Sequence, residues 1–269
     1  MCKPASLVVS RRQVWWHPTS DSHEDIIAKY RIHIDGTHGA NAVPVEIAPD
    51  DGDLSRPLSE WTFRTDHAGY MRDLPDWWDA QREEQRSRAA LEDWAAVRLC
   101  GWRLQEAFHP HNPFAGPPEP MSRQHVEELM YQWASVWDSV WASVWASAWD
   151  SVRASVRASV GASVWDSVRD SVWASVWDSV RDSVGNSVGN SVGASVWAYT
   201  GSLFPNITKW RHTDLVSPWD ALRELWLSGR VPSFDGTTWR VHVGPDAHVE
   251  MEFSIAAVEA ALEEHNNEQ

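Results

Sequence analysis

The chain of 269 residues lacks the features that mark several common protein classes. It has only two cysteines, Cys2 and Cys100, which lie too far apart in the chain to suggest the disulfide framework of a small secreted domain. No run of about 18 apolar residues is present, so no membrane span is expected. The opening stretch "MCKPASLVVS" is too polar for a signal peptide. We therefore expect a protein of the cytoplasm.

Positive charge is also in short supply. The chain has 23 Lys and Arg against 38 Asp and Glu, which gives a formal net charge of −15. Direct nucleic-acid binding is disfavoured, because proteins that contact the phosphate backbone need clustered Lys and Arg. The acidity leaves open the opposite case, a protein that mimics nucleic acid and occupies the basic site of an enzyme. A hydrophobic content of 43% is enough for a folded core.

The motifs of common catalytic sites are missing. The sequence has no GxxxxGK[ST] or GxGxxG phosphate-binding loop, no GxSxG nucleophile turn and no HExxH zinc motif. The N-terminal region holds four histidines close to three carboxylates, namely His17, His23, His33, His38, Glu24, Asp25 and Asp35. Without a metal-ligand spacing, we interpret these as ordinary structural or surface residues. We predict no catalytic residue, no metal site and no cofactor.

The abundant feature is a four-residue repeat, which "WDSVRDSVGNSVGNSV" between Trp177 and Val192 exemplifies. Each unit reads Trp/Arg/Gly, Ala/Asp/Asn, Ser, Val. In an α-helix, four residues advance by about 400°, so each Val would lie about 40° beyond the last, and over the whole repeat the Val stripe would circle the helix. Ser, Asp, Asn, Val and Gly are also mediocre or poor helix formers. A single strand of this length would be far longer than strands normally are.

These arguments predict a short β-solenoid, in which each tetrapeptide forms one side of a coil and coils stack about 4.8 Å apart. Coils of three or of four sides are both acceptable. The predicted fold class is α+β, with mixed α/β regions on both sides of the solenoid. The predicted domains are an N-terminal mixed region ending in helices (1–132), the solenoid (133–198) and a C-terminal region of helix and β-hairpins (199–269).

The flanking regions carry ordinary secondary-structure signals. "SLVVS" and "VPVEI" predict strands, and "SDSHEDIIAKY" predicts a helix capped by Ser20, Asp21 or Ser22. Apolar spacing predicts a long helix over residues 79–108 and another from Ser122.

The C-terminal flank has equally clear signals. "SPWDALRELWLSG" predicts a helix with Ser217 as its cap, and "SIAAVEAALEEH" predicts a terminal helix. Hairpin turns are expected at Asp235-Gly236 and at Gly244-Pro245.

Tryptophan is unusually frequent, with 20 copies, many of them in the first position of the repeat. That position also holds Arg and Gly, whose codons can differ from that of Trp by one base, so the array is consistent with duplication of a short unit. A packed core site would not accept such different side chains, so the first position is expected to face outward. An exposed apolar ladder usually marks an interface, although cover by the flanking regions or by a second copy is equally open. The predicted partner-binding residues are Trp133, Trp137, Trp141, Trp145, Trp149, Trp165, Trp173 and Trp177.

Four stretches of the N-terminal region, "MCKPASLVV", "SDSHEDII", "VPVEIAPDDGDLSRPLSEW" and "LPDWWD", resemble the N-terminal module of an uncharacterised family found in bacteriophage and bacterial genomes. Members of that family carry the module followed by short tandem repeats. The resemblance covers residues 1–95 and the repeat architecture. It implies a phage-derived protein, present in the host cytoplasm if phage-encoded, and it implies no chemistry. A looser likeness is to pentapeptide-repeat β-solenoid proteins, from which the unit length and the central Val depart.

The sequence therefore predicts a non-enzymatic repeat scaffold or binding protein, which contacts a protein partner or a second copy through a solenoid face or the Trp ladder. Two alternatives stay open: an acidic, nucleic-acid-mimicking inhibitor of a host enzyme, and a carbohydrate-binding or virion surface module. The sequence leaves small-molecule ligands undecided.

Overall fold

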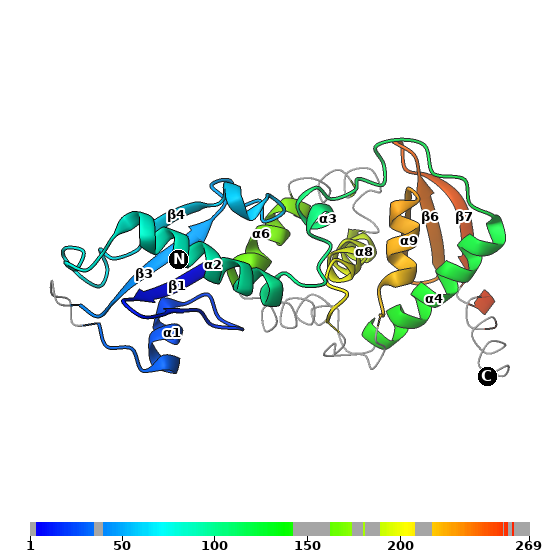
Figure 1. Ribbon diagram of the computed structural model, residues 1–269. Coiled ribbons are helices and arrows are strands. Elements are labelled where there is room, and N and C mark those ends of the chain that lie inside the picture. The colour runs from blue at the N-terminus through cyan, green and yellow to red at the C-terminus, as the bar shows by residue number, and fades with distance from the viewer. Residues whose placement is uncertain are drawn as a thin grey trace. The chain divides into compact units, whose positions relative to one another are not determined.

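The computed structural model describes residues 4–34, 40–141, 162–173, 189–207 and 217–254, together with a few isolated positions (Figure 1). The chain divides into two compact units. The first unit contains Met1–Leu104 and Val156–Val168, and the second contains Gln105–Ser155 and Arg169–Gln269. The predicted boundaries after residues 132 and 198 lie at the ends of the four-residue repeat, whereas the two units are defined by how compactly the chain packs. The predicted boundaries stay a prediction.

The first unit is built on an antiparallel sheet of four strands in the order β2-β1-β3-β4. The strands are β1 (Ala5–Ser10), β2 (Val14–Trp15), β3 (Ala42–Ala48) and β4 (Thr62–Thr65). The strands predicted at "SLVVS" and "VPVEI" are confirmed as β1 and β3. Every residue of β1 is buried, which requires that both faces of the sheet be covered at this strand.

Two helices contact β1 in the first unit, α1 (His23–Tyr30) and α2 (Ala80–Arg98). On α1, Ile26 packs against Val8 and Ala42 of the sheet, and all three are fully buried. The Ser22 side chain caps α1 by accepting a hydrogen bond from the backbone N–H of Asp25, and it is one of the three residues that the sequence offers as the cap.

The single helix predicted over residues 79–108 is two helices. The first is α2, and the second is α3 (Leu104–Phe108). Between them, Gly101 has a φ of 78°, a left-handed conformation that interrupts the helix. Near α2, a short 3-10 helix, η1 (Leu58–Glu60), is followed by Trp61, whose buried ring meets that of Trp94 edge to face at 6.0 Å.

The second unit contains an antiparallel sheet of three strands in the order β5-β6-β7. The strands are β5 (Arg230–Phe234), β6 (Thr238–Val243) and β7 (His248–Ser254). Both predicted hairpin turns are present, with Gly236 at φ 101° and Gly244 at φ 73°.

Helix α9 (Asp220–Leu227) is central to the second unit, because it contacts α4 (Arg123–Trp141), α8 (Gly189–Ser202) and β5. Its N-cap residue is Trp219, which makes no side-chain capping hydrogen bond, so the predicted Ser217 cap is wrong. Among the helices that the described residues form, none combines the length and the apolar character needed to cross a membrane.

The predicted β-solenoid is wrong. Wherever the structure describes the repeat, its regular structure is helical: the last part of α4, then α6 (Ala162–Val172), then α8. Neither sheet includes a strand from these described repeat residues. The observed class is a mixture of α-helices and two small antiparallel sheets, without a solenoid among the described residues.

Helix length explains the failure of the prediction. The 40° drift of Val excludes one helix running through the whole repeat, but α6 spans only 11 residues and α8 only 14. Over so few units the Val column stays within the apolar stripe of about 100° that a packed helix buries. In α6, Val168 is 0% exposed and Val172 is 2% exposed. Packing of this stripe compensates for the poor helix propensity of Ser, Asp and Gly.

Candidate functional site

The predicted tryptophan ladder begins inside the second unit rather than on its surface. Trp133 and Trp137 on α4 are each 3% exposed, and their rings meet edge to face at 5.9 Å. Trp137 also packs edge to face on Trp239 of β6 at 5.3 Å. These two positions correct the expectation of outward-facing tryptophans, because both rings are buried and Trp137 packs on the sheet of its own unit.

Trp173, which follows α6, is 42% exposed and lies beside Trp197 of α8, with ring centroids 6.4 Å apart. It is the one predicted ladder residue that is exposed among those whose side chains the structure describes. The side chains of the remaining five, Trp141, Trp145, Trp149, Trp165 and Trp177, lie outside the described residues. Their predicted partner-binding role stays a prediction.

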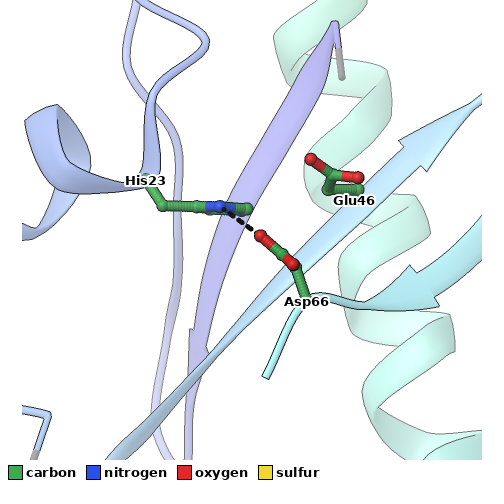
Figure 2. A group of neighbouring side chains, drawn as sticks. All are labelled: His23, Glu46 and Asp66. Carbon is green, nitrogen blue, oxygen red and sulfur yellow. Dashed lines mark ion pairs between the residues drawn. The ribbon is translucent and has the colours of Figure 1, made fainter. Parts of the chain in front are cut away.

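A cluster of one histidine and two carboxylates lies in the first unit, where α1 begins (Figure 2). His23 is the first residue of α1, Glu46 lies on β3, and Asp66 directly follows β4. One potential ligand atom from each residue lies within 4.8 Å of the others. The His23 side chain is fully buried, whereas the Asp66 side chain is 46% exposed.

Local contacts fix the positions of these residues. The backbone N–H of Asp66 donates to Pro44 O at 2.9 Å, which anchors the chain after β4 to β3. The ring edge of Tyr70 meets the His23 ring at 6.1 Å, and the Tyr70 hydroxyl donates to Glu24 at 2.6 Å. The Tyr70 and Ser22 hydroxyls together lower the pKa of Glu24 to about 2. Glu24 is therefore ionised at neutral pH.

A second feature of the first unit is an open hollow of about 530 Å³, lined by the turn between β1 and β2 and by the end of α1. Arg11, Arg12 and Arg31 line it, together with the rings of Trp15 and Tyr30. Within the part of the chain that the structure describes, none of the three arginines forms an ion pair with a carboxylate. Among the described residues, the hollow is therefore a concentration of positive charge that no carboxylate pairs with.

The backbone under these arginines is well defined. Ser10 Oγ accepts hydrogen bonds from the backbone N–H groups of Arg12 and Gln13, at 3.3 and 3.1 Å. Arg31 ends α1 with a φ of 53°, a left-handed conformation that glycine normally adopts at this position. A side chain there carries a backbone cost of about 1 kcal/mol relative to glycine.

A buried serine–histidine pair lies in the second unit. Ser233 Oγ on β5 is 2.7 Å from His242 Nε2 on β6, and His242 Nδ1 is 3.0 Å from Ala247 O. Since a carbonyl only accepts, Nδ1 carries the hydrogen and Nε2 accepts from Ser233. Ser233 is 0% exposed, so a substrate has no access to its hydroxyl, and the pair is structural.

Both features of the first unit join residues that lie far apart in the sequence. No sequence pattern places Glu46 and Asp66 beside His23. A signal for the hollow is present in the sequence, because "SRRQVWW" and "KYRIH" place Arg beside aromatic residues in a chain otherwise short of positive charge.

Comparisons with known proteins add no relative, because no family model matches the chain and neither a curated protein nor a solved structure matches it. The resemblance to the phage and bacterial family therefore stays a prediction.

Proposed function

We propose that the chain is a non-enzymatic binding protein whose first unit holds an acidic segment of a protein partner. The observation that carries this proposal is the hollow lined by Arg11, Arg12 and Arg31, whose charge is not neutralised within the described chain. Guanidinium groups bind carboxylates through paired, charge-assisted hydrogen bonds. Three of them converging on one hollow, in a chain of net charge −15, form a local site for an anionic partner.

The shape of the hollow favours a peptide segment over a lone small anion. It is open rather than enclosed, and its lining includes the rings of Trp15 and Tyr30, with centroids 6.4 Å apart. Aromatic rings give contact area to the apolar parts of a bound chain, while the arginines select its acidic side chains. A partner with carboxylates beside apolar groups fits this combination.

The test is a titration of the full chain against a fluorescein-labelled peptide of alternating Glu and Leu, read by fluorescence anisotropy at about 50 mM salt. We expect binding that Arg12→Gln and Arg31→Gln each weaken by about tenfold or more, because each loses a charge-assisted contact. Arg72→Gln is the matched control. Its side chain is 92% exposed in the same unit, and it is expected to leave the affinity unchanged.

Two results would overturn the proposal. Equal affinities for the wild type and both hollow variants would show that the peptide binds elsewhere. Inorganic phosphate or a nucleoside triphosphate that displaces the peptide completely at similar concentration would assign the hollow to small anions instead.

The two alternative functions predict different observations. A nucleic-acid mimic would compete with DNA for a basic enzyme, and the binding would weaken steeply with salt regardless of the hollow variants. A carbohydrate-binding module would be retained on a glycan column through Trp173, the exposed tryptophan described above, and Trp173→Ser would abolish retention. We also propose a cytoplasmic location, in a host cell if the gene is phage-borne. The exposed free thiol of Cys100 supports a reducing compartment.

A further inference from the structure

The hydrogen bond at one side of the His23 ring defines the state of the other side. Nε2 lies 3.0 Å from the carbonyl oxygen of Val45. A carbonyl oxygen only accepts, so Nε2 carries the ring hydrogen. In the neutral ring, the lone pair therefore belongs to Nδ1.

Nδ1 is buried and faces a negatively charged atom. It lies 3.2 Å from Asp66 Oδ2, has no hydrogen-bond partner, and belongs to a side chain that is 0% exposed. A nitrogen lone pair and a carboxylate oxygen repel each other at this distance unless a cation lies between them. Glu46, the third member of the cluster, adds further negative charge.

We propose that His23, Glu46 and Asp66 bind a first-row divalent cation of the zinc type. An imidazole nitrogen with two carboxylates is a ligand set that suits Zn²⁺ and its first-row neighbours, whereas Mg²⁺ and Ca²⁺ prefer oxygen ligands alone. The hydrogen bond from Nε2 to a backbone carbonyl is the outer contact that metal-bound histidines characteristically make, and it orients Nδ1 for coordination.

The geometry is close to that of a bound site. Donor atoms on a tetrahedral ion at Zn–N and Zn–O distances lie about 3.4 Å from one another, and the three donors here lie within 4.8 Å. The histidine is held by its burial and by Val45. The half-exposed Asp66 carboxylate has room to rotate the remaining distance, and it also gives the ion a route from solvent. Three protein ligands leave a coordination position for water.

The site is separate from the proposed function. His23 begins α1, whereas the arginine hollow lies where α1 ends. Because the ligands come from α1, β3 and the chain after β4, a bound ion would join three elements of the first unit. Binding to the folded state alone would raise its stability.

The experiment is isothermal titration calorimetry of the chelator-washed full chain with ZnCl₂, and separately with MgCl₂. We expect one Zn²⁺ site that Asp66→Asn and Glu46→Gln each weaken by at least about tenfold, and no comparable heat with MgCl₂. Both substitutions change side chains that are not fully buried and keep their size, so the fold is retained. A matched control is His248→Gln: His248 Nδ1 lies 3.1 Å from Asp246 Oδ1 in an exposed pair of the second unit. This variant is expected to keep the Zn²⁺ site.

A second readout follows the ring itself. Nitrogen NMR of the His23 side chain is expected to show a shift of Nδ1, and not of Nε2, when ZnCl₂ is added. If Zn²⁺ does not bind, or if it binds Asp66→Asn as tightly as the wild type, the cation between His23 and Asp66 is a proton and the proposal is wrong. The Zn²⁺ experiment changes no residue of the arginine hollow. Its failure would therefore not affect the result of the peptide titration, and the two proposals are tested separately.

Discussion

Two histidines of the second unit have pKa values displaced in opposite directions. Hydrogen bonds to Glu224, at 2.6 Å, and to Glu128 raise the pKa of His125 above its ordinary value of 6.5. Burial lowers the pKa of His242, because its charged form would lose hydration between β5 and β6. Acidification therefore strengthens the contact of His125 with Glu224, whereas protonation of the buried His242 opposes folding.

The His125–Glu224 pair gives a prediction about stability and pH. A group whose pKa is higher in the folded state stabilises that state fully below its unfolded value of 6.5, and this contribution is lost as pH rises through the folded value. We expect Glu224→Gln to lower the urea midpoint more at about pH 5.5 than at about pH 8.5. Urea titrations of both proteins at the two pH values test this, and an equal difference at both would contradict it.

The buried Ser233–His242 hydrogen bond gives a second prediction. Ser233→Ala leaves His242 Nε2 without its donor in a place that is closed to water. The expected loss is about 1–3 kcal/mol in the free energy of unfolding, the usual penalty for an unsatisfied buried polar group. Ser135→Ala on α4 is the control, with an expected change within about 0.5 kcal/mol. Denaturant unfolding of the wild type, Ser233→Ala and Ser135→Ala measures the two losses in free energy of unfolding. Similar losses for the two variants would contradict a stabilising Ser233–His242 hydrogen bond.

A capping hydrogen bond stabilises the first turn of α1. Ser22 Oγ accepts from the N–H of Asp25 at 3.3 Å, at the helix end that carries His23. Ser22→Ala is expected to destabilise the chain by about 0.5–2 kcal/mol. Ser22→Asp retains a capping oxygen and should recover most of the loss. Thermal unfolding followed by circular dichroism compares the variants, and equal melting temperatures for Ala and Asp would count against a capping role.

Helix packing in the second unit gives a prediction at Gly201 of α8. A methyl group on this residue would lie 2.7 Å from Nε1 of Trp219, a ring that is 4% exposed and has little room to move. Alanine normally stabilises a helix relative to glycine, but overpacking here is expected to cost about 1–3 kcal/mol. Gly69→Ala, where nothing lies within 4 Å, is the control and should be close to neutral. A stabilised Gly201→Ala protein in denaturant titration would show that the ring moves aside.

Elements whose signals are local could be predicted from the sequence. The cap at Ser22, the helix of "SPWDALRELWLSG" and the two hairpin turns depend on neighbouring residues alone. The repeat could not, because its period fits a helix only if the helix is short, and helix length depends on packing. On such a helix Val and the following first-position residue lie about 100° apart, so packing decides whether both are buried, as Val136 and Trp137 are, or only the Val, as at Val172 and Trp173.

The candidate sites depend on contacts between segments that are distant in the sequence. The sequence therefore shows the residue types, but it does not predict which residues lie together. His23 was grouped with Glu24 and Asp25, its chain neighbours. Consecutive helical residues project about 100° apart, and both carboxylates are exposed while the ring is buried. Glu46 and Asp66 reach the ring because antiparallel pairing places β3 and β4 side by side.

At the scale of the whole molecule, net charge sets solution behaviour. The sequence pI is about 5.1, and at neutral pH a charge of −15 adds a repulsion between copies of the chain. We expect a solubility minimum near this pI, where the repulsion vanishes. Light scattering across the pH range locates it. A minimum near neutral pH would indicate that an attraction other than loss of net charge drives association.

The shortness of the repeat helices has a consequence for how such a gene can change. Replication slippage that inserts one tetrapeptide into a helix lengthens it by about 6 Å and turns its distal part by only about 40°. That rotation keeps Val within the buried stripe, whereas two or three successive insertions would carry it toward solvent. We therefore expect helices such as α6 and α8 to accept the insertion of one repeat unit more readily than the insertion of several.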